Sequence, residues 1–300
     1  MSLRDVGLAL LATLVWGLSF IAIKLGVAEA PPFLLSALRF FFAAVPMVFF
    51  VRAPAAPIRL IVLYGLFIGV GQFGLLFLAI RLGMPVGLSS LVIQAQVFMT
   101  IALAWVLRGE RPSRVQIVAS LIALAGVCTI AYARLSGASF LPFALTIAAA
   151  FCWAAGNLTG KFAGRVDALA FTAWSSLVAP LPMLALSFAF EGDRTLPALL
   201  HPTWTLALSI AALSYGGTLF SYGVWSRLLM RYPAATVAPY ALLIPIVGMG
   251  AARLLFAEQP SAIEFGGALL IMAGLGFNIL ADRLQARFRR SRDLPCTTSS

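Results

Sequence analysis

Six hydroxyl and aromatic side chains share one side of a predicted helix over residues 203–228. At 100° per residue they fall within about 120° of arc. In an apolar helix such a face points into protein or water, so it forms either hydrogen bonds between helices or the wall of a cavity. We favour the cavity wall, whose chemistry would be recognition of a small solute. The residues are Ser214, Tyr215, Thr218, Ser221, Tyr222 and Trp225.

The equivalent face of an earlier helix, predicted over residues 58–81, is apolar and aromatic. It lies 148 residues before the polar face and includes Phe73 and Phe77. Two walls of this kind suit a ligand that has an apolar body and one polar end.

Further residues able to bind such a ligand lie on three other apolar segments. Trp16 stands one turn before Phe20, and Trp153 stands one turn before Asn157. Residues 86–107 offer two polar faces, of which only one can line a cavity. Ser90 and Gln94 form the first face, and Ser89, Gln96 and Thr100 form the second.

Three basic residues are candidates for gating. Arg39 lies inside an apolar segment, where it either reaches the headgroups or backbone carbonyls or binds a substrate carboxylate or a gate partner. Lys24 and Lys161 end their segments, so each either extends to the headgroups or attracts a carboxylate at one mouth of a cavity.

Prolines predict a broken helix near residues 234–256. Pro239 and Pro245 lie inside this apolar segment, where a mid-helix proline frees a carbonyl and bends the helix. Freed carbonyls at membrane depth require protein or water around them. We therefore expect either a hinge with Tyr240 beside the site, where the carbonyls receive an ammonium group, or a plain structural kink.

Acidic residues are missing from the apolar segments. Of the ten, only Glu264 approaches one, and Ser261 with Glu264 forms a helix-capping box, as Ser113 does with Gln116. The single histidine, His201, lies in a polar stretch. The sequence therefore argues against a proton relay through carboxylates or histidine, a cation exporter with a buried glutamate and an intramembrane enzyme. We expect no metal and no cofactor.

Composition sets the class of the protein. Hydrophobic residues make up 62% of the 300 and charged residues 10%, against about 25% charged in soluble domains. The chain is an all-α integral membrane protein within the lipid bilayer. A crossing takes about 20 apolar residues, which predicts ten transmembrane helices over 7–27, 33–51, 58–81, 86–107, 114–133, 140–161, 168–190, 203–228, 234–256 and 262–281.

The same segments occur twice along the chain. Trp16 and Lys24 match Trp153 and Lys161, and GERPS at 109–113 matches AEQPS at 257–261. The offset grows from 137 to 148 near residues 191–202, which we interpret as a longer polar loop. The prediction is two five-helix repeats, 1–137 and 138–282, followed by a basic tail at 283–300. Five is odd, so the second repeat is inverted in the membrane, as in secondary transporters.

Basic residues indicate the orientation. With the N-terminus inside, fifteen Lys and Arg residues lie at inner ends and five at outer ends. This bias places both termini in the cytoplasm. It also accounts for the net charge of +11 without a nucleic-acid partner.

WGLSFIAIK, PPFLLSALRF and the two repeated turns resemble the drug/metabolite transporter superfamily of the EamA type. Within it the chain is most similar to the YddG-type exporters of aromatic and other amino acids. The resemblance implies a bacterial inner-membrane carrier that moves small metabolites outward by alternating access at a central cavity. The alternatives are an exporter of drugs or other metabolites, a sugar-phosphate carrier, and a receptor or scaffold without transport. We expect a monomer.

Overall fold

The computed structural model describes residues 1–109, 112–135, 140–164, 166–232, 237, 240–241, 243–257, 259, 261–274 and 276–277. These residues are helical almost throughout, and none of them lies in a strand. The predicted tail at 283–300 lies outside the described residues.

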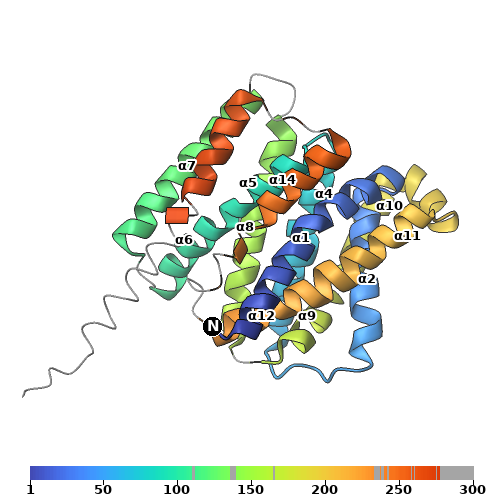
Figure 1. Ribbon diagram of the computed structural model, residues 1–300. Helices are drawn as coiled ribbons and strands as arrows, with labels where there is room; N and C mark the ends of the chain where they lie inside the picture. The colour runs from blue at the N-terminus through green and yellow to red at the C-terminus, as the bar shows by residue number, and fades with distance from the viewer. Residues whose placement is uncertain are drawn as a thin grey trace, which may run out of the picture.

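The first half of the chain comprises α1 (Leu3–Glu29), α2 (Pro32–Val48), α3 (Ile58–Tyr64), η1 (Gly65–Gln72), α4 (Phe73–Arg81), α5 (Val86–Val92), η2 (Ile93–Ala95), α6 (Gln96–Arg108) and α7 (Arg114–Leu135). The second half comprises α8 (Phe140–Ala163), α9 (Ala168–Ser176), α10 (Pro180–Leu200), α11 (Trp204–Ala211), η3 (Ala212–Tyr222), α12 (Gly223–Arg231), α14 (Leu243–Phe256) and a helix over Ala262–Gly274. Figure 1 shows their arrangement.

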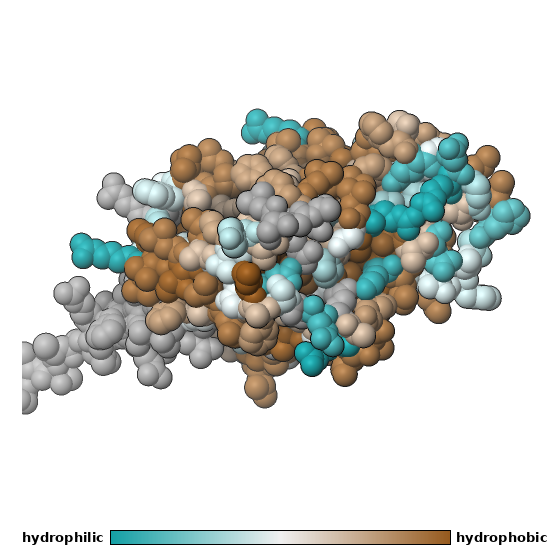
Figure 2. Space-filling model, turned by 90° about the horizontal axis from the view of Figure 1, so that it is seen from above, coloured by the Kyte–Doolittle hydropathy of each residue, from teal (hydrophilic) through white to brown (hydrophobic). Residues whose placement is uncertain are grey.

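Each of the ten predicted spans coincides with a helix or a run of helical segments, although the last two are described only in part. Six helices among the described residues are long and apolar enough to cross a membrane. Three shorter apolar helices are Pro32–Val48, Ile244–Phe256 and Ala262–Gly274. Apolar side chains cover most of the face seen in Figure 2, as a protein surrounded by lipid requires.

Both predicted capping boxes are present. Ser113 N donates to Gln116 Oε1 at 2.7 Å, and Gln116 N donates to Ser113 Oγ at 3.2 Å. Ser261 N donates to Glu264 Oε2 at 2.8 Å, and Glu264 N donates back to Ser261 Oγ at 3.3 Å. Glu264 therefore begins a helix, as the sequence predicted.

The prediction of a polar loop at 191–202 is wrong for most of these residues, because α10 continues to Leu200. Leucine, alanine, glutamate and arginine favour a helix there. Thr195 Oγ1 donates to the carbonyls of Ser187 and Glu191, each at 3.2 Å. The extra residues of the second half thus lengthen a helix, and the chain turns only at His201.

Two π-helices occupy equivalent places in the two halves. The 148-residue offset carries η1, Gly65–Gln72, onto residues 213–220, which lie inside η3, Ala212–Tyr222. In η3 the hydroxyls of Thr218 and Ser221 donate to carbonyls five residues earlier, at 3.0 and 2.9 Å. Such π-turns are frequent at functional sites.

The halves pack reciprocally. The first helix of one half, α1, contacts η3 and α14 of the other, and α8 contacts η1 and α6 in the corresponding way. The centre of the bundle is therefore built from both halves. Helix α7 and Ala262–Gly274 pack against each other at one side of this body (Figure 1), where Gly126 and Gly267 allow close approach.

Candidate functional site

A small chamber lies among buried side chains at the centre of the bundle. Its volume is about 30 Å³, far below the roughly 300–1,000 Å³ of a typical ligand pocket. Helices of both halves contribute to its wall. The lining residues are Trp16, Ser19, Phe20, Ile23, Arg39, Gln72, Phe73, Leu76, Ile93, Trp153, Tyr222 and Ile244.

Trp16 is at the centre of the aromatic wall. Its ring centroid lies 4.8 Å from that of Tyr222, 5.2 Å from Trp225 and 5.8 Å from Trp153, all edge-on. Phe73 lies 6.1 Å from Tyr222 and continues the wall. Edge-to-face contacts of this kind are favourable by about 0.5–1.5 kcal/mol beyond burial. The structure thus brings together five aromatic residues that the sequence singled out.

Two hydrogen bonds tie the halves together at this wall. Trp16 Nε1 donates to the carbonyl of Gly217 at 3.0 Å, and the Tyr222 hydroxyl donates to Gln72 Oε1 at 3.0 Å. Little space surrounds Gly217 on this side. A Cβ there would lie 3.2 Å from Ser19 Oγ and 3.3 Å from Arg39 Nη2.

Arg39 on α2 is the charged member of the chamber wall. Its side chain is 1% exposed. Its Nε donates to Thr218 Oγ1 at 2.8 Å, and its Cζ lies 3.7 Å from the centre of the Phe73 ring. Ser214 Oγ donates to the Arg39 carbonyl at 2.8 Å. The polar face of η3 therefore positions the arginine, which does not extend to the headgroups.

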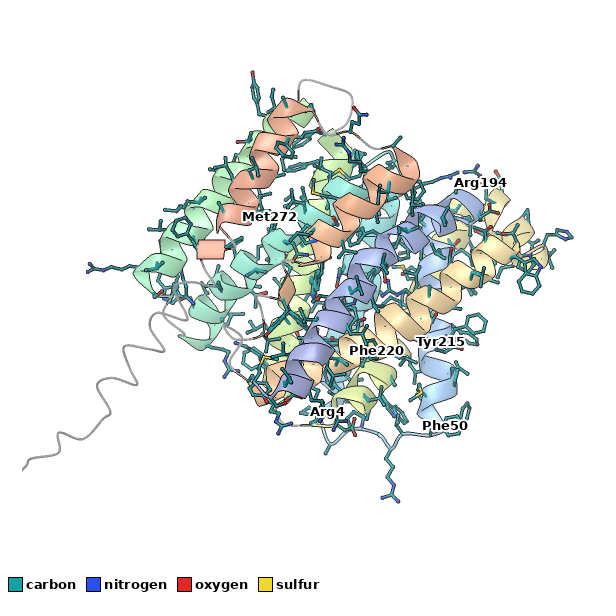
Figure 3. The ribbon with its side chains drawn as sticks, viewed as in Figure 1. Arg4, Phe50, Arg194, Tyr215, Phe220 and Met272 are labelled. Atoms are coloured by element: carbon teal, nitrogen blue, oxygen red, sulfur yellow. The ribbon has the colours of Figure 1, made fainter. Side chains whose placement is uncertain are left out.

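The remaining residues of the predicted faces differ in their surroundings. Phe77 and Trp225 are buried directly behind the chamber wall, and Ser221 is bonded within η3. Phe20 lines the chamber. Tyr215, in contrast, lies on the outside of the bundle with 47% exposure (Figure 3).

The polar residues of the fourth span do not line the chamber. Ser90 and Gln94 are buried, and Ser90 Oγ donates to the Gly87 carbonyl at 2.6 Å. Asn157 on α8 donates to Gln96 Oε1 at 2.9 Å and to Thr100 Oγ1 at 3.4 Å. Gln96 and Thr100 of the second predicted face therefore connect α6 to α8 by hydrogen bonds. Ile93, which lies between the two predicted faces, lines the chamber.

Apart from Arg39, the candidate gate and hinge residues that the structure describes do not line the chamber. Lys24 Nζ is 4.0 Å from the centre of the Phe256 ring, and Lys161 is in the last turn of α8. Pro239 lies outside the described residues. Pro245 is in the first turn of α14, where a missing N–H costs little. Tyr240 is partly buried against the core in a short 3₁₀ turn.

Six chamber residues were not singled out from the sequence: Ser19, Ile23, Gln72, Leu76, Ile93 and Ile244. Two signals could have found some of them. Ser19 and Ile23 follow Trp16 at helical spacing, and Gln72 carries the single amide of the segment 58–81. The described residues hold no group of three or more His, Cys, Asp or Glu that could bind a metal.

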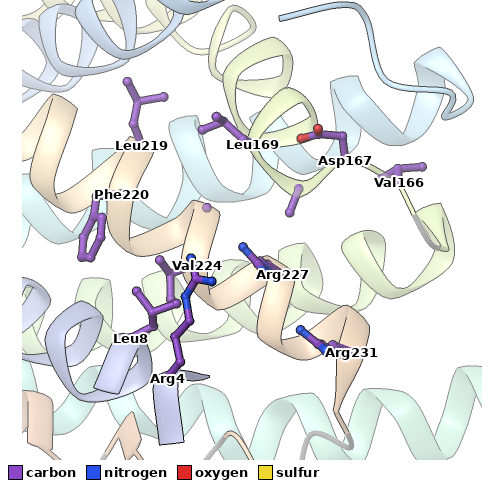
Figure 4. Close-up of a pocket in the computed structure, with 12 residues that line it drawn as sticks. Arg4, Leu8, Val166, Asp167, Leu169, Leu219, Phe220, Val224, Arg227 and Arg231 are labelled. Carbon is purple, nitrogen blue, oxygen red and sulfur yellow. The ribbon is translucent and has the colours of Figure 1, made fainter. Parts of the chain in front are cut away.

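A larger hollow of about 840 Å³ lies at the N-terminal end of α1, beside α9 and α12. Arg4, Arg227 and Arg231 lie around it, with Phe220 and Val224 beside them (Figure 4). The residues that line this hollow and those that line the chamber do not overlap, so the two are separate.

An apolar helical bundle with a polar and aromatic chamber at its centre defines a class, the polytopic membrane carriers. The EamA-like transporter family model matches residues 4–132 and again residues 141–280, and the chain belongs to this family. It is a multi-pass protein of the inner membrane.

Curated relatives match over almost the whole length. A "Probable amino-acid metabolite efflux pump" of Salmonella typhimurium is 42% identical over 298 residues, covering 97% of this chain and 100% of the relative. A protein of the same name in Escherichia coli is 41% identical over 290 residues, covering 94% and 97%. A crystal structure of a protein 21% identical in sequence has a TM-score of 0.67 and covers 95% of this chain and 99% of its own. That likeness shows the fold.

Proposed function

We propose that this transporter exports, or facilitates the diffusion of, small amphipathic metabolites, most of all amino acids with hydrophobic or aromatic side chains. The observation that carries the proposal is the chamber between the halves, which Arg39 lines together with Trp16, Phe73, Trp153 and Tyr222. Aromatic walls accept an apolar body, and the buried polar groups orient its polar end.

Alternating access supplies the mechanism. A chamber of about 30 Å³ is too small for an amino acid, so the helices around it must separate for binding. The bonds from Trp16 to Gly217 and from Tyr222 to Gln72 join the two halves across the chamber. Breaking these few contacts on one side would open the chamber to that side, which is how rocking of two halves works in secondary transporters.

The inverted-repeat arrangement, with halves 1–137 and 138–282, is supported by three observations. The family model matches the chain twice. The π-helices η1 and η3 occupy equivalent positions. The pairing of α1 with η3 and α14 has its counterpart in the pairing of α8 with η1 and α6. We also propose that both termini lie in the cytoplasm, which the bias in basic residues supports.

The substrate class is supported from two sides. The relatives with 42% and 41% identity are named amino-acid metabolite efflux pumps. In addition, the chamber has one buried cation and no acidic lining residue among those described, which suits an anionic or zwitterionic solute better than a cationic drug.

The test is uptake of labelled Trp, Phe, Leu, Thr and Lys into proteoliposomes that contain the purified protein, with and without a pH gradient. We expect saturable flux of the apolar and aromatic members without a gradient. Protein-free liposomes are the control. Absence of flux for all five amino acids would indicate drugs or other metabolites as the substrates. Flux that required the pH gradient would contradict facilitated diffusion.

A further inference from the structure

We propose that Arg39 binds the carboxylate of the transported solute, so that the carrier selects monocarboxylates with an apolar body. This inference rests on the proposed function and specifies its ligand. It starts from the balance of charge at the chamber.

No carboxylate among the described residues matches the charge of Arg39. Its Nε bonds to the neutral hydroxyl of Thr218, and its face stacks on Phe73. Its Nη1 is buried and has no hydrogen-bond partner. Within the described part of the chain, Arg39 forms no ion pair with a carboxylate.

A buried charge without a counter-ion is costly, and an ionisable group inside a membrane protein marks a substrate pathway unless a partner explains it. Thr218 and Phe73 hold the guanidinium in place without neutralising it. Ser214, which lies on η3 like Thr218, donates a hydrogen bond to the backbone carbonyl of Arg39 and so fixes its backbone. The arginine is therefore positioned in advance for an anion that none of the described residues supplies.

The chemistry of the anion follows from the surrounding residues. A planar guanidinium binds a carboxylate through two parallel N–H donors. The rest of the wall is aromatic or aliphatic apart from Ser19 and Gln72. A phosphate would leave charge unmatched, since Arg39 is the one basic residue among the chamber lining residues. A single carboxylate on an apolar body is matched in both charge and shape.

The experiment compares each acid with its amide. Unlabelled phenylalanine and phenylalaninamide, and leucine and leucinamide, compete against uptake of labelled phenylalanine in proteoliposomes. The amides keep the size and the amino group but lose the carboxylate charge. We expect half-inhibition by the amides to require on the order of 10- to 100-fold higher concentration, as loss of a hydrogen bond to a charged group predicts. Equal inhibition by acid and amide, with saturable uptake intact, would overturn the role of Arg39 and leave the transport function standing.

The same ratio is then measured in Arg39→Gln and Arg39→Lys. We expect the acid-to-amide ratio to fall to about one in Arg39→Gln and to an intermediate value in Arg39→Lys. A variant with reduced uptake that kept the wild-type ratio would show a purely structural arginine and contradict the proposal. Arg59→Gln, an exposed arginine at the start of α3, is the matched control.

Thermal stabilisation of the purified wild-type protein by the same acids and amides repeats the comparison without any variant, in case Arg39→Gln does not fold. We expect melting to shift with the acids at concentrations where the amides have no effect. Equal shifts from both series, or a shift from neither, would overturn the inference. Absence of uptake of every amino acid would instead contradict the proposed function.

Discussion

The hydroxyl of Tyr232 donates a hydrogen bond of 2.6 Å to Oδ2 of Asp5, and so joins the residue after α12 to the first turn of α1. Asp5 is 2% exposed, and Ser2 Oγ donates to the same oxygen at 2.9 Å. Arg231 Nη1 lies 3.7 Å from that oxygen. The start of the chain is thus tied to the end of the eighth span.

Removing this hydrogen bond should loosen the contact between the two helix ends. Tyr232→Phe keeps the ring and loses the donor, and hydrogen bonds to charged groups contribute about 1.5–3 kcal/mol. We expect a lower apparent melting temperature in detergent. Tyr215→Phe, whose ring lies on the outside of the bundle, is the control. Equal melting temperatures for Tyr232→Phe and wild type would show that the contact does not stabilise the fold.

The two equivalent tryptophans should respond differently to substitution by phenylalanine. Trp16 Nε1 is bonded to the Gly217 carbonyl, whereas Trp153 Nε1 is buried without a partner. Trp16→Phe should therefore lose about 1 kcal/mol more stability than Trp153→Phe, because a buried hydrogen bond contributes about that amount. Thermal unfolding of both variants under one condition measures the difference. The reverse order would mean that the bond to Gly217 does not stabilise this wall.

The contact between α7 and Ala262–Gly274 depends on glycine. A Cβ on Gly267 would lie 2.7 Å from Ile130 Cγ1 and 2.8 Å from the Gly126 carbonyl, while a Cβ on the neighbouring Gly266 has no atom within 4 Å. We expect Gly267→Ala to destabilise the protein by about 1–3 kcal/mol through overpacking. Gly266→Ala should leave folded yield and melting unchanged or slightly improved. Similar behaviour of the two variants in gel filtration and melting would rule out this packing.

Transport should depend on the inner face that η3 and the start of α12 share, and not on the outer face of η3. Tyr222→Ala and Trp225→Ala each remove a ring in contact with Trp16, and we expect amino-acid uptake to fall about tenfold or more, a loss of about 1.4 kcal/mol. Tyr215→Ala on the same helix should transport normally. Folded yield is measured alongside, and Tyr222→Phe serves if the alanine variant does not fold. Normal uptake by both inner-face variants would remove η3 and α12 from the transport pathway.

The sequence by itself determined the membrane class, the positions of the spans and the two capping boxes. These features are local, because about 20 apolar residues cross the bilayer and a capping box bonds residues three apart. Sequence also indicated Trp16, Phe73, Trp153 and Tyr222, since large aromatic residues on repeated segments stand out without any knowledge of packing.

Tertiary structure decided which face of each helix meets the others. The helical wheel placed Tyr215 at the edge of the face that contains Ser214, yet Tyr215 lies outside and Ser214 is buried against Arg39. The packing of α1 and α2 against η3 decides where the buried face ends. The Gln72 side chain lines the chamber, where its Oε1 accepts a hydrogen bond from Tyr222, 150 residues further along the chain. Periodicity tells which residues share a face, but only packing determines what that face contacts.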